Sequence, residues 1–270
     1  MRLPVFEGPV WARGKGSVVE SGNAADAGQQ VLLETFEEGA ALFGLLGRLF
    51  HGVPDRELFA AAVDGRVFDG VPLLPARVCR EGLDKLVAWQ DDCAAPFSSA
   101  DYEELQADYA HLFVGTRRVL APMWESVYFN RDRMVFQRQT FQVRSDYARY
   151  GLEVDALSHE PDDHLAYELL FVARLFEVAG AKMGDGDEAG ASEVLGDLGR
   201  FTSRHLLMWL PMWVPLVERH ARADFYPGYA RLVLDACKYV DDQVTGWQAQ
   251  AAQGREEILP RVPALDGDAV

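Results

Sequence analysis

Side chains suited to ionic chemistry gather in the segment H-E-P-D-D-H, residues 159–164. Glu160 and Asp163 supply carboxylates beside His164, and a carboxylate pairs bidentately with a guanidinium group. The same segment is also typical of a helix start, with Pro161 at the first helical position and aspartates at the positive end of the helix dipole. From these residues alone, a helix start is the favoured interpretation and a site for a cationic group is the alternative.

A metal site is another interpretation of this segment. Histidine and carboxylate are common zinc ligands, and His159, Asp163 and His164 would supply them in a metal-dependent helical hydrolase. His159 and His164 are five positions apart and straddle Pro161, however, so they do not form an H-E-x-x-H pair on one helical face. The hydrolase therefore stays a secondary hypothesis.

Other catalytic signatures are missing from the sequence. Ser126 lies in W-E-S-V-Y and not in G-x-S-x-G, and neither a Walker A motif nor a G-x-G-x-x-G loop occurs. Cys79, Cys93 and Cys237 are far apart and form no C-x-x-C, which argues against a disulfide framework and a tetrathiolate zinc site. These residues give no reason to expect an enzyme.

Composition and charge limit the class of partner. The chain of 270 residues is 49% hydrophobic and has a formal net charge of −16, so it would repel the phosphate backbone of nucleic acid. We expect no nucleic-acid partner, whereas a cationic peptide or an apolar surface suits the composition. The longest apolar run, residues 206–217, contains two prolines and is shorter than the roughly 20 residues that span a bilayer. We therefore expect no stable membrane insertion and a cytoplasmic location.

Charge is unevenly distributed along the chain. Residues 117–149 contain seven arginines and three acids, a net charge of +4, whereas residues 151–200 contain three bases and twelve acids, a net charge of −9. Solvated helix surfaces are the usual cause of such runs, and a shared functional cleft is the alternative.

The elements that must position these residues follow a helical period. Apolar residues recur at spacings of three and four and strict alternation never persists, which predicts an all-α fold. We expect one helical-bundle-like domain of about ten helices over residues 28–249, with flexible segments at 1–27 and 250–270. The expected helices cover 27–49, 55–63, 74–89, 132–151, 192–209, 211–220 and 226–248, and two more begin at an N-cap at Ser99 or Asp101 and at the 159–164 turn.

Two further segments have distinct patterns. Residues 116–130 follow Gly115, which should stop the preceding helix. Trp124 and Tyr128, two large aromatic residues within this segment, indicate an ordered loop and not a polar linker. His205 and Trp209 lie four apart and are expected in the core. A groove for an apolar peptide, edged by Met208, Trp209, Met212 and Trp213, is the alternative for that region.

Four motifs follow one another along the chain. They are Y-x-x-L-x-x-x-Y-x-x-L-F-x-G at 102–115, A-P-x-W-x-S-V-Y at 121–128, E-P-D-D-H at 160–164 and H-L-L-x-W-L-P at 205–211. Their order and spacing resemble the TorD/DmsD family of redox-enzyme maturation chaperones over about residues 32–247. The chain departs from this family at Thr116, where proline is frequent, and at Glu125, where glycine is frequent.

The resemblance implies an all-helical cytoplasmic chaperone without enzymatic turnover. Such a chaperone binds the twin-arginine leader and the apo catalytic subunit of a molybdenum or tungsten oxidoreductase, and holds it for cofactor insertion before Tat export. No tightly bound cofactor is implied, and transient binding of the molybdopterin cofactor or a guanine nucleotide stays open, as does the choice between a monomer and a domain-swapped dimer. The implied peptide-binding residues are Trp124, Ser126 and Tyr128 in the loop and Glu160, Asp163 and His164 in the turn, so we expect loop and turn to share one cleft.

Overall fold

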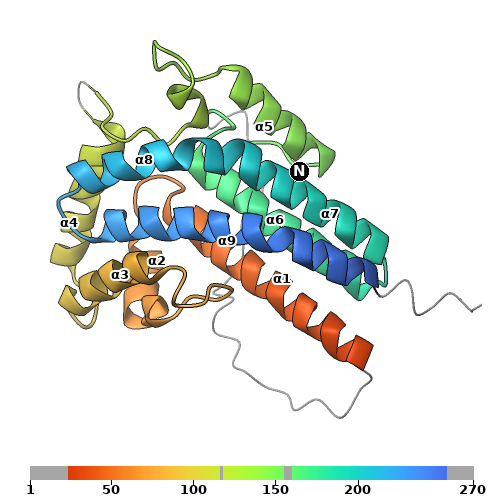
Figure 1. The fold of residues 1–270 in the computed structure, drawn as a ribbon. Coiled ribbons are helices and arrows are strands. Elements are labelled where there is room, and N and C mark those ends of the chain that lie inside the picture. The colour runs from red at the N-terminus through yellow and green to blue at the C-terminus, as the bar shows by residue number, and fades with distance from the viewer. Residues whose placement is uncertain (1–23, 116–117, 155–159, 254–270) are drawn as a thin grey trace, which may run out of the picture.

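The computed structural model describes residues 24–115, 118–154 and 160–253, and within these ranges it is built from helices (Figure 1). An isolated β-bridge joins Trp124 and His164. The predicted all-α fold is confirmed, and the described α-helices, α1 to α9, are slightly fewer than the ten or so expected. Among the described helices, none has the length and apolar character needed to cross a membrane.

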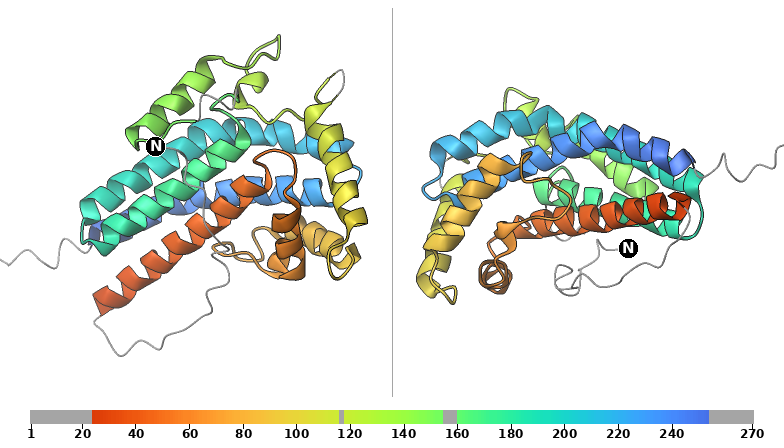
Figure 2. Two further views of the ribbon diagram at one scale, coloured as in Figure 1. Left: turned by 180° about the vertical axis from the view of Figure 1, so that it is seen from behind. Right: turned by 60° about the horizontal axis from the view of Figure 1, so that its bottom comes forward.

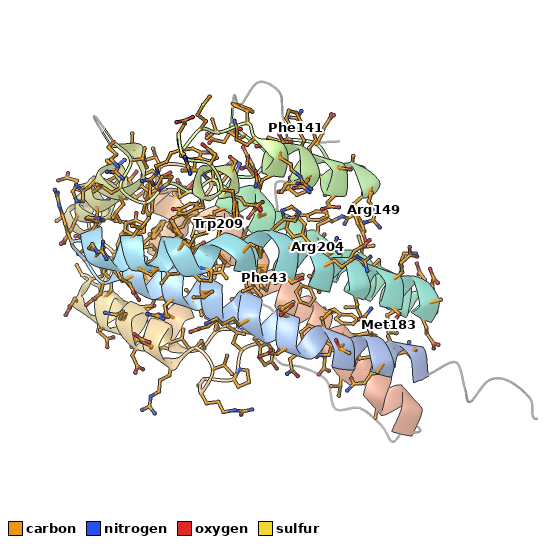
Figure 3. The ribbon with its side chains drawn as sticks, turned by 45° about the horizontal axis from the view of Figure 1, so that its top comes forward. Phe43, Phe141, Arg149, Met183, Arg204 and Trp209 are labelled. Atoms are coloured by element: carbon orange, nitrogen blue, oxygen red, sulfur yellow. The ribbon has the colours of Figure 1, made fainter. Side chains whose placement is uncertain are left out.

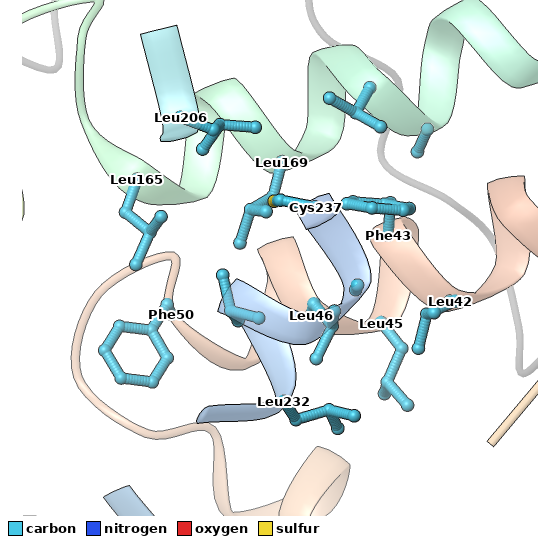
Figure 4. Close-up of a cluster of buried hydrophobic side chains, with 14 of the residues drawn as sticks. Leu42, Phe43, Leu45, Leu46, Phe50, Leu165, Leu169, Leu206, Leu232 and Cys237 are labelled. Carbon is cyan, nitrogen blue, oxygen red and sulfur yellow. The ribbon is translucent and has the colours of Figure 1, made fainter. Parts of the chain in front are cut away.

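Four long helices form the body of the bundle. They are α1 (Ala24–Leu49), α6 (Leu165–Gly184), α7 (Glu188–Phe201) and α9 (Phe225–Gln253), with α1 packed on α6 and α7 packed on both α6 and α9. The glycines of α1 permit close packing: a Cβ added at Gly39 would lie 2.7 Å from the ring of Phe176. Figure 4 shows leucines and aromatic rings of α1, α6 and α9 meeting in this core, with the thiol of Cys237 among them.

The smaller helices α2 (Arg56–Asp64), α3 (Arg80–Asp92) and α4 (Ser99–Tyr109) lie at one end of the bundle (Figure 2). Helix α3 begins six residues later than predicted, because the preceding segment contains two prolines and turns at Leu73, which has φ +67°. The N-cap of α4 is Ser98 and not Ser99 or Asp101. Asp101 completes the capping box, since its side chain accepts from the backbone N–H of Ser98.

Helix α4 continues into a π-helical turn, Ala110–Val114, which stops at Gly115 as predicted. Gly115 has φ +60° and ψ 152°, a conformation that is essentially restricted to glycine. The chain then folds back, and the backbone N–H of Ala121 donates to Leu112 O. The described part of the 116–130 segment is therefore an ordered loop, as expected, and it includes the 3₁₀ turn η4 (Glu125–Tyr128).

Helix α5 (Arg138–Arg149) also begins six residues later than predicted. Arg133 and Phe136 have positive φ, and the Asn130 side chain bonds the backbone N–H and the carbonyl of Met134, which holds this stretch in turns. On α5 itself, Thr140, Val143 and Tyr147 face the core, whereas Phe136, which precedes the helix, is exposed.

The predicted break between the helices at 192–209 and 211–220 is wrong in position. Helix α7 leads through a π-helical turn, Thr202–Leu206, into α8 (Leu207–His220), and Pro211 and Pro215 are inside α8. Both prolines lie on the exposed side of α8, where their rings do not disturb the core. The π turn is the actual irregularity, and it places His205 on the buried side.

Candidate functional site

The loop before α5 and the turn before α6 lie together, as expected from the sequence. The backbone N–H of Glu125 donates to Asp163 O at 3.0 Å, and that of Leu165 donates to Met123 O at 2.8 Å. The rings of Trp124 and His164 lie 5.6 Å apart, edge to face. Two segments that are more than thirty positions apart in sequence thus form one unit.

The interpretation of residues 160–164 as the first turn of a helix is wrong. Helix α6 begins at Leu165, and His164 is its N-cap, with the ring Nδ1 accepting from the backbone N–H of Ala166 at 3.2 Å. Pro161 precedes the helix because this stretch pairs with the loop instead. The two aspartates are consequently free to bond side chains and backbone of other elements.

Asp163 fastens the loop to α5. Its carboxylate is fully buried and accepts from the backbone N–H of Ser126 and from the hydroxyl of Thr140, both at 2.7 Å. The neighbouring Asp162 is held by the guanidinium of Arg144, with Nη2 2.7 Å from Oδ2. These contacts make the 160–164 turn a rigid junction between the loop, α5 and α6.

Trp124, Glu160 and His164 line one pocket of about 290 Å³. The other lining residues come from the turn after α1, from α4 and its π turn, from the loop that follows, and from α6. They are mostly aromatic or apolar: His51, Gly52, Tyr109, Phe113, Val114, Val119, Met123 and Tyr167. The motif at 102–115 already contained Tyr109 and Phe113, but sequence analysis gave them no role, and His51 and Tyr167 had no signal.

The pocket contains the carboxylate of Glu160 and the imidazole rings of His51 and His164. The indole N–H of Trp124 donates to Glu160 Oε1 at 2.6 Å, which orients that carboxylate. Burial, and then the charge of His51, lower the pKa of His164 to about 3, so its ring is neutral at pH 7, and Nε2 carries the proton because Nδ1 caps α6. Burial, and then the charge of Glu160, raise the pKa of Tyr109 to about 12.

The remaining predicted residues, Ser126 and Tyr128, lie behind the pocket. Ser126 is fully buried, and its hydroxyl has no hydrogen-bond partner among the described residues. The Tyr128 hydroxyl donates to Pro122 O at 2.8 Å, and its ring stacks on Trp209 with centroids 5.3 Å apart. With Asp163, these residues support the loop and do not line the pocket.

A buried ionic network that sequence analysis missed supports the same loop. His205 Nδ1 lies 2.8 Å from Glu125 Oε2, and its Nε2 lies 3.4 Å from Asp146 Oδ2. Burial alone would lower the pKa of His205. The hydrogen bonds to Asp146 and Glu125 outweigh burial and raise the pKa to about 9, so the ring is protonated at pH 7. Burial, and then the charges of Glu125 and Asp163, raise the pKa of Glu168 well above its usual range.

The H-L-L-x-W-L-P motif at 205–211 lies partly in the hydrophobic core. His205 and Trp209 are buried as predicted, and the indole N–H of Trp209 donates to Glu168 Oε2 at 3.2 Å. Of the four residues suggested as the edge of an apolar groove, only Met208 and Met212 are exposed. Trp213 is buried and donates to Ala121 O, so a groove built from all four residues is wrong.

Two of the three residues proposed for a metal site, Asp163 and His164, have other partners. His159 lies outside the described residues, both Asp163 oxygens accept hydrogen bonds, and the ring of His164 caps α6. Among the residues that the structure describes, no three His, Cys, Asp or Glu side chains are grouped to hold a metal ion.

Comparison with known proteins supplies an independent finding. A family model described as nitrate reductase delta subunit matches residues 78–214, half of the chain. The chaperone protein TorD of Vibrio cholerae serotype O1 is 31% identical over 131 residues, 48% of this chain and 58% of that protein. The Tat proofreading chaperone DmsD of Salmonella typhi is 27% identical over 139 residues, 52% of this chain and 61% of that protein. The chain thus spans less than two thirds of the length of these relatives. These matches, together with the four motifs and the helical fold, show that the chain belongs to the TorD/DmsD family.

Proposed function

We propose that this protein is a cytoplasmic chaperone that binds the twin-arginine leader of a molybdenum or tungsten oxidoreductase. The observation that carries the proposal is the pocket in which Trp124, Glu160 and His164 meet, from two segments distant in sequence. Relatives whose names describe chaperones and Tat proofreading support it.

The chemistry of the pocket suits one arginine of such a leader. Glu160 supplies a carboxylate for the guanidinium, and its attachment to Trp124 fixes its direction. Aromatic rings on several sides, among them Tyr109 and Tyr167, favour a cation and also cover the apolar stem of an arginine. The neutral His164 can donate Nε2–H to a peptide carbonyl, and it adds no positive charge that would repel the guanidinium.

Exposed apolar side chains around η4, the turn directly after Trp124, suit the hydrophobic run that follows the arginines of a leader. Large apolar side chains are exposed on the segment after η4, on α5 and on α8: Phe129, Met134, Phe136, Phe141, Met208 and Met212. The turn η4 contacts both α5 and α8, and Figure 3 shows Phe141 on the outer side of α5. Methionine side chains adapt to varied apolar partners, as a leader receptor requires.

The wider role follows from binding the leader before export. We propose that the chaperone holds the apo catalytic subunit until its cofactor is inserted, releases it for Tat export and performs no enzymatic turnover itself. In this role it needs no tightly bound cofactor, and a transient contact with molybdopterin or a guanine nucleotide would occur only during loading. Charge complementarity between the acidic chain and the basic leader would speed capture.

Calorimetric titration with two leader peptides tests the proposal. A twin-arginine peptide should bind more tightly than its double-lysine version, because lysine cannot form the bidentate contact. Glu160→Gln should weaken binding of the twin-arginine peptide by about tenfold, the low end for a charge-assisted contact, since Glu160 is half-exposed. Glu57→Gln on α2 removes one exposed carboxylate elsewhere and is the matched control. Equal affinity of the wild type and Glu160→Gln for the twin-arginine peptide would refute the assignment of this pocket.

A further inference from the structure

A second pocket, of about 310 Å³, lies between α5 and the α7 to π-turn segment. Three arginines line it: Arg149 from α5, Arg200 from α7 and Arg204 from the π turn. Figure 3 labels Arg149 and Arg204, which lie near each other between these elements. None of these arginines belongs to the leader pocket, and the proposed function gives them no part.

The arginines retain hydrogen-bond donors for a ligand. Arg149 holds Asp197 through Nη1 and Nη2, at 3.1 and 2.6 Å, and Arg200 bonds the same carboxylate, so Asp197 aligns both guanidinium groups. A guanidinium has five N–H donors, so each keeps several free of Asp197. Arg204 is exposed, and no ion pair or hydrogen bond of its side chain is found within the described residues.

The charge of the lining has the opposite sign to that of the whole chain. The three arginines and the protonated His205 face the carboxylates of Asp146 and Asp197, which leaves a surplus of positive charge even when the buried Glu125 beneath His205 is included. The chain as a whole has a net charge of −16. A cationic leader would be repelled here, whereas an anion would be attracted.

We propose that this pocket binds the phosphate group of a small phosphorylated ligand. Guanidinium forks match the geometry of phosphate oxygens, and Ser145 at the pocket wall is a further hydroxyl donor. Gln142 and the rings of Tyr150, Phe171 and Phe201 also line the pocket, and Tyr150, which is less buried than the two phenylalanines, offers its ring to a sugar or a planar group. The volume is at the low end for ligand pockets, so the ligand has one phosphate and a small attached group.

Titration of the full chain at low ionic strength tests this proposal, with inorganic phosphate, guanosine monophosphate and guanosine as probes. We expect both phosphates to bind and guanosine to bind at least about tenfold more weakly than guanosine monophosphate. Tighter binding of the nucleotide than of inorganic phosphate would identify an organic phosphate as the ligand, and equal binding would identify free phosphate. No detectable binding of either phosphate below about 10 mM would overturn the proposal.

A pair of variants locates the binding. Arg204→Gln should weaken phosphate binding by about fivefold to tenfold and leave the thermal stability unchanged, because Arg204 has no structural partner in the described part of the chain. Arg219→Gln, at an exposed arginine near the end of α8, should change neither. Equal phosphate affinity of the wild type and Arg204→Gln would also overturn the proposal. Since the leader pocket is separate, leader binding by Arg204→Gln should stay at the wild-type level, so the two proposals can fail independently.

Discussion

Raising the pH from 6.5 to 8.5 should destabilise the protein through His205. In the folded chain its pKa is raised to about 9, against about 6.5 for an unfolded histidine. A raised pKa in the folded state adds stability that is fully present below pH 6.5 and is lost as the pH rises through 9. Linkage over this interval gives a loss of about 2 kcal/mol in the free energy of unfolding.

Few other groups with shifted pKa values interfere within this interval. The pKa of His164 is lowered to about 3, so its effect is confined to pH values below about 6.5. Burial raises the pKa of the Cys93 thiol to about 12, and unfolded thiols ionise mainly above pH 8.5. The pKa of Glu168 is also raised, by burial and then by the charges of Glu125 and Asp163, so the share of His205 is measured as the difference in pH dependence between the wild type and a His205 variant.

Urea denaturation at pH 6.5, 7.5 and 8.5, followed by tryptophan fluorescence at constant ionic strength, measures this loss. His205→Gln will be less stable at every pH, because Glu125 stays buried without its cationic partner, but between pH 6.5 and 8.5 its free energy of unfolding should fall by about 2 kcal/mol less than that of the wild type. His220→Gln, at the end of α8, should retain the wild-type dependence. Equal pH dependence of the wild type and His205→Gln would show that the proton on His205 does not link Glu125 to α5.

Three further substitutions test how the loop is held, each by urea denaturation. Gly115→Ala should lower the free energy of unfolding by about 1 to 3 kcal/mol, because φ is +60° and the added Cβ would lie 2.5 Å from the Arg118 carbonyl oxygen. An unchanged free energy of unfolding would contradict this backbone geometry. Asp163→Ala should cost about 2 to 4 kcal/mol, since it leaves a buried N–H at Ser126 and the Thr140 hydroxyl unpaired, and a cost below about 1 kcal/mol would refute the anchoring role. Ser126→Ala should change stability by less than about 1 kcal/mol and leave leader affinity unaltered, because the hydroxyl has no partner among the described residues; a loss of affinity would restore Ser126 as a contact residue.

The helices were predictable because their signals are local. Spacing of apolar residues and capping residues such as Asp55 act within a few positions, so the bounds of α1 and α2 agree closely with the predicted ranges. The starts of α3 and α5 were wrong by six residues, since turns with positive φ compete with the helical pattern there. The start of α6 was wrong for another reason: backbone pairing with the distant loop moves the 160–164 turn out of the helix.

The site was predictable in its location but not in its chemistry. The resemblance identified the two segments that meet, and Trp124, Glu160 and His164 line one pocket. The resemblance could not show that Asp163 and Ser126 lie outside the pocket. The burial of Asp163 depends on Thr140 of α5, which is distant in sequence. The ion pair between Glu125 and His205, eighty positions apart, has no local signal at all.

Photo-cross-linking of a twin-arginine leader tests the central claim most directly. Val114 is at the rim of the leader pocket and 57% exposed, and Val31 on α1 is 59% exposed and outside the pocket, so the two positions are matched in residue type and exposure. With benzoylphenylalanine at position 114, we predict efficient cross-linking to the leader, suppressed by excess unlabelled twin-arginine peptide and much less by its double-lysine version. Position 31 should give only a weak product that competition does not change. Equal cross-linking at both positions, or no cross-linking at 114 under conditions in which the leader binds, would contradict the assignment of the leader to this pocket.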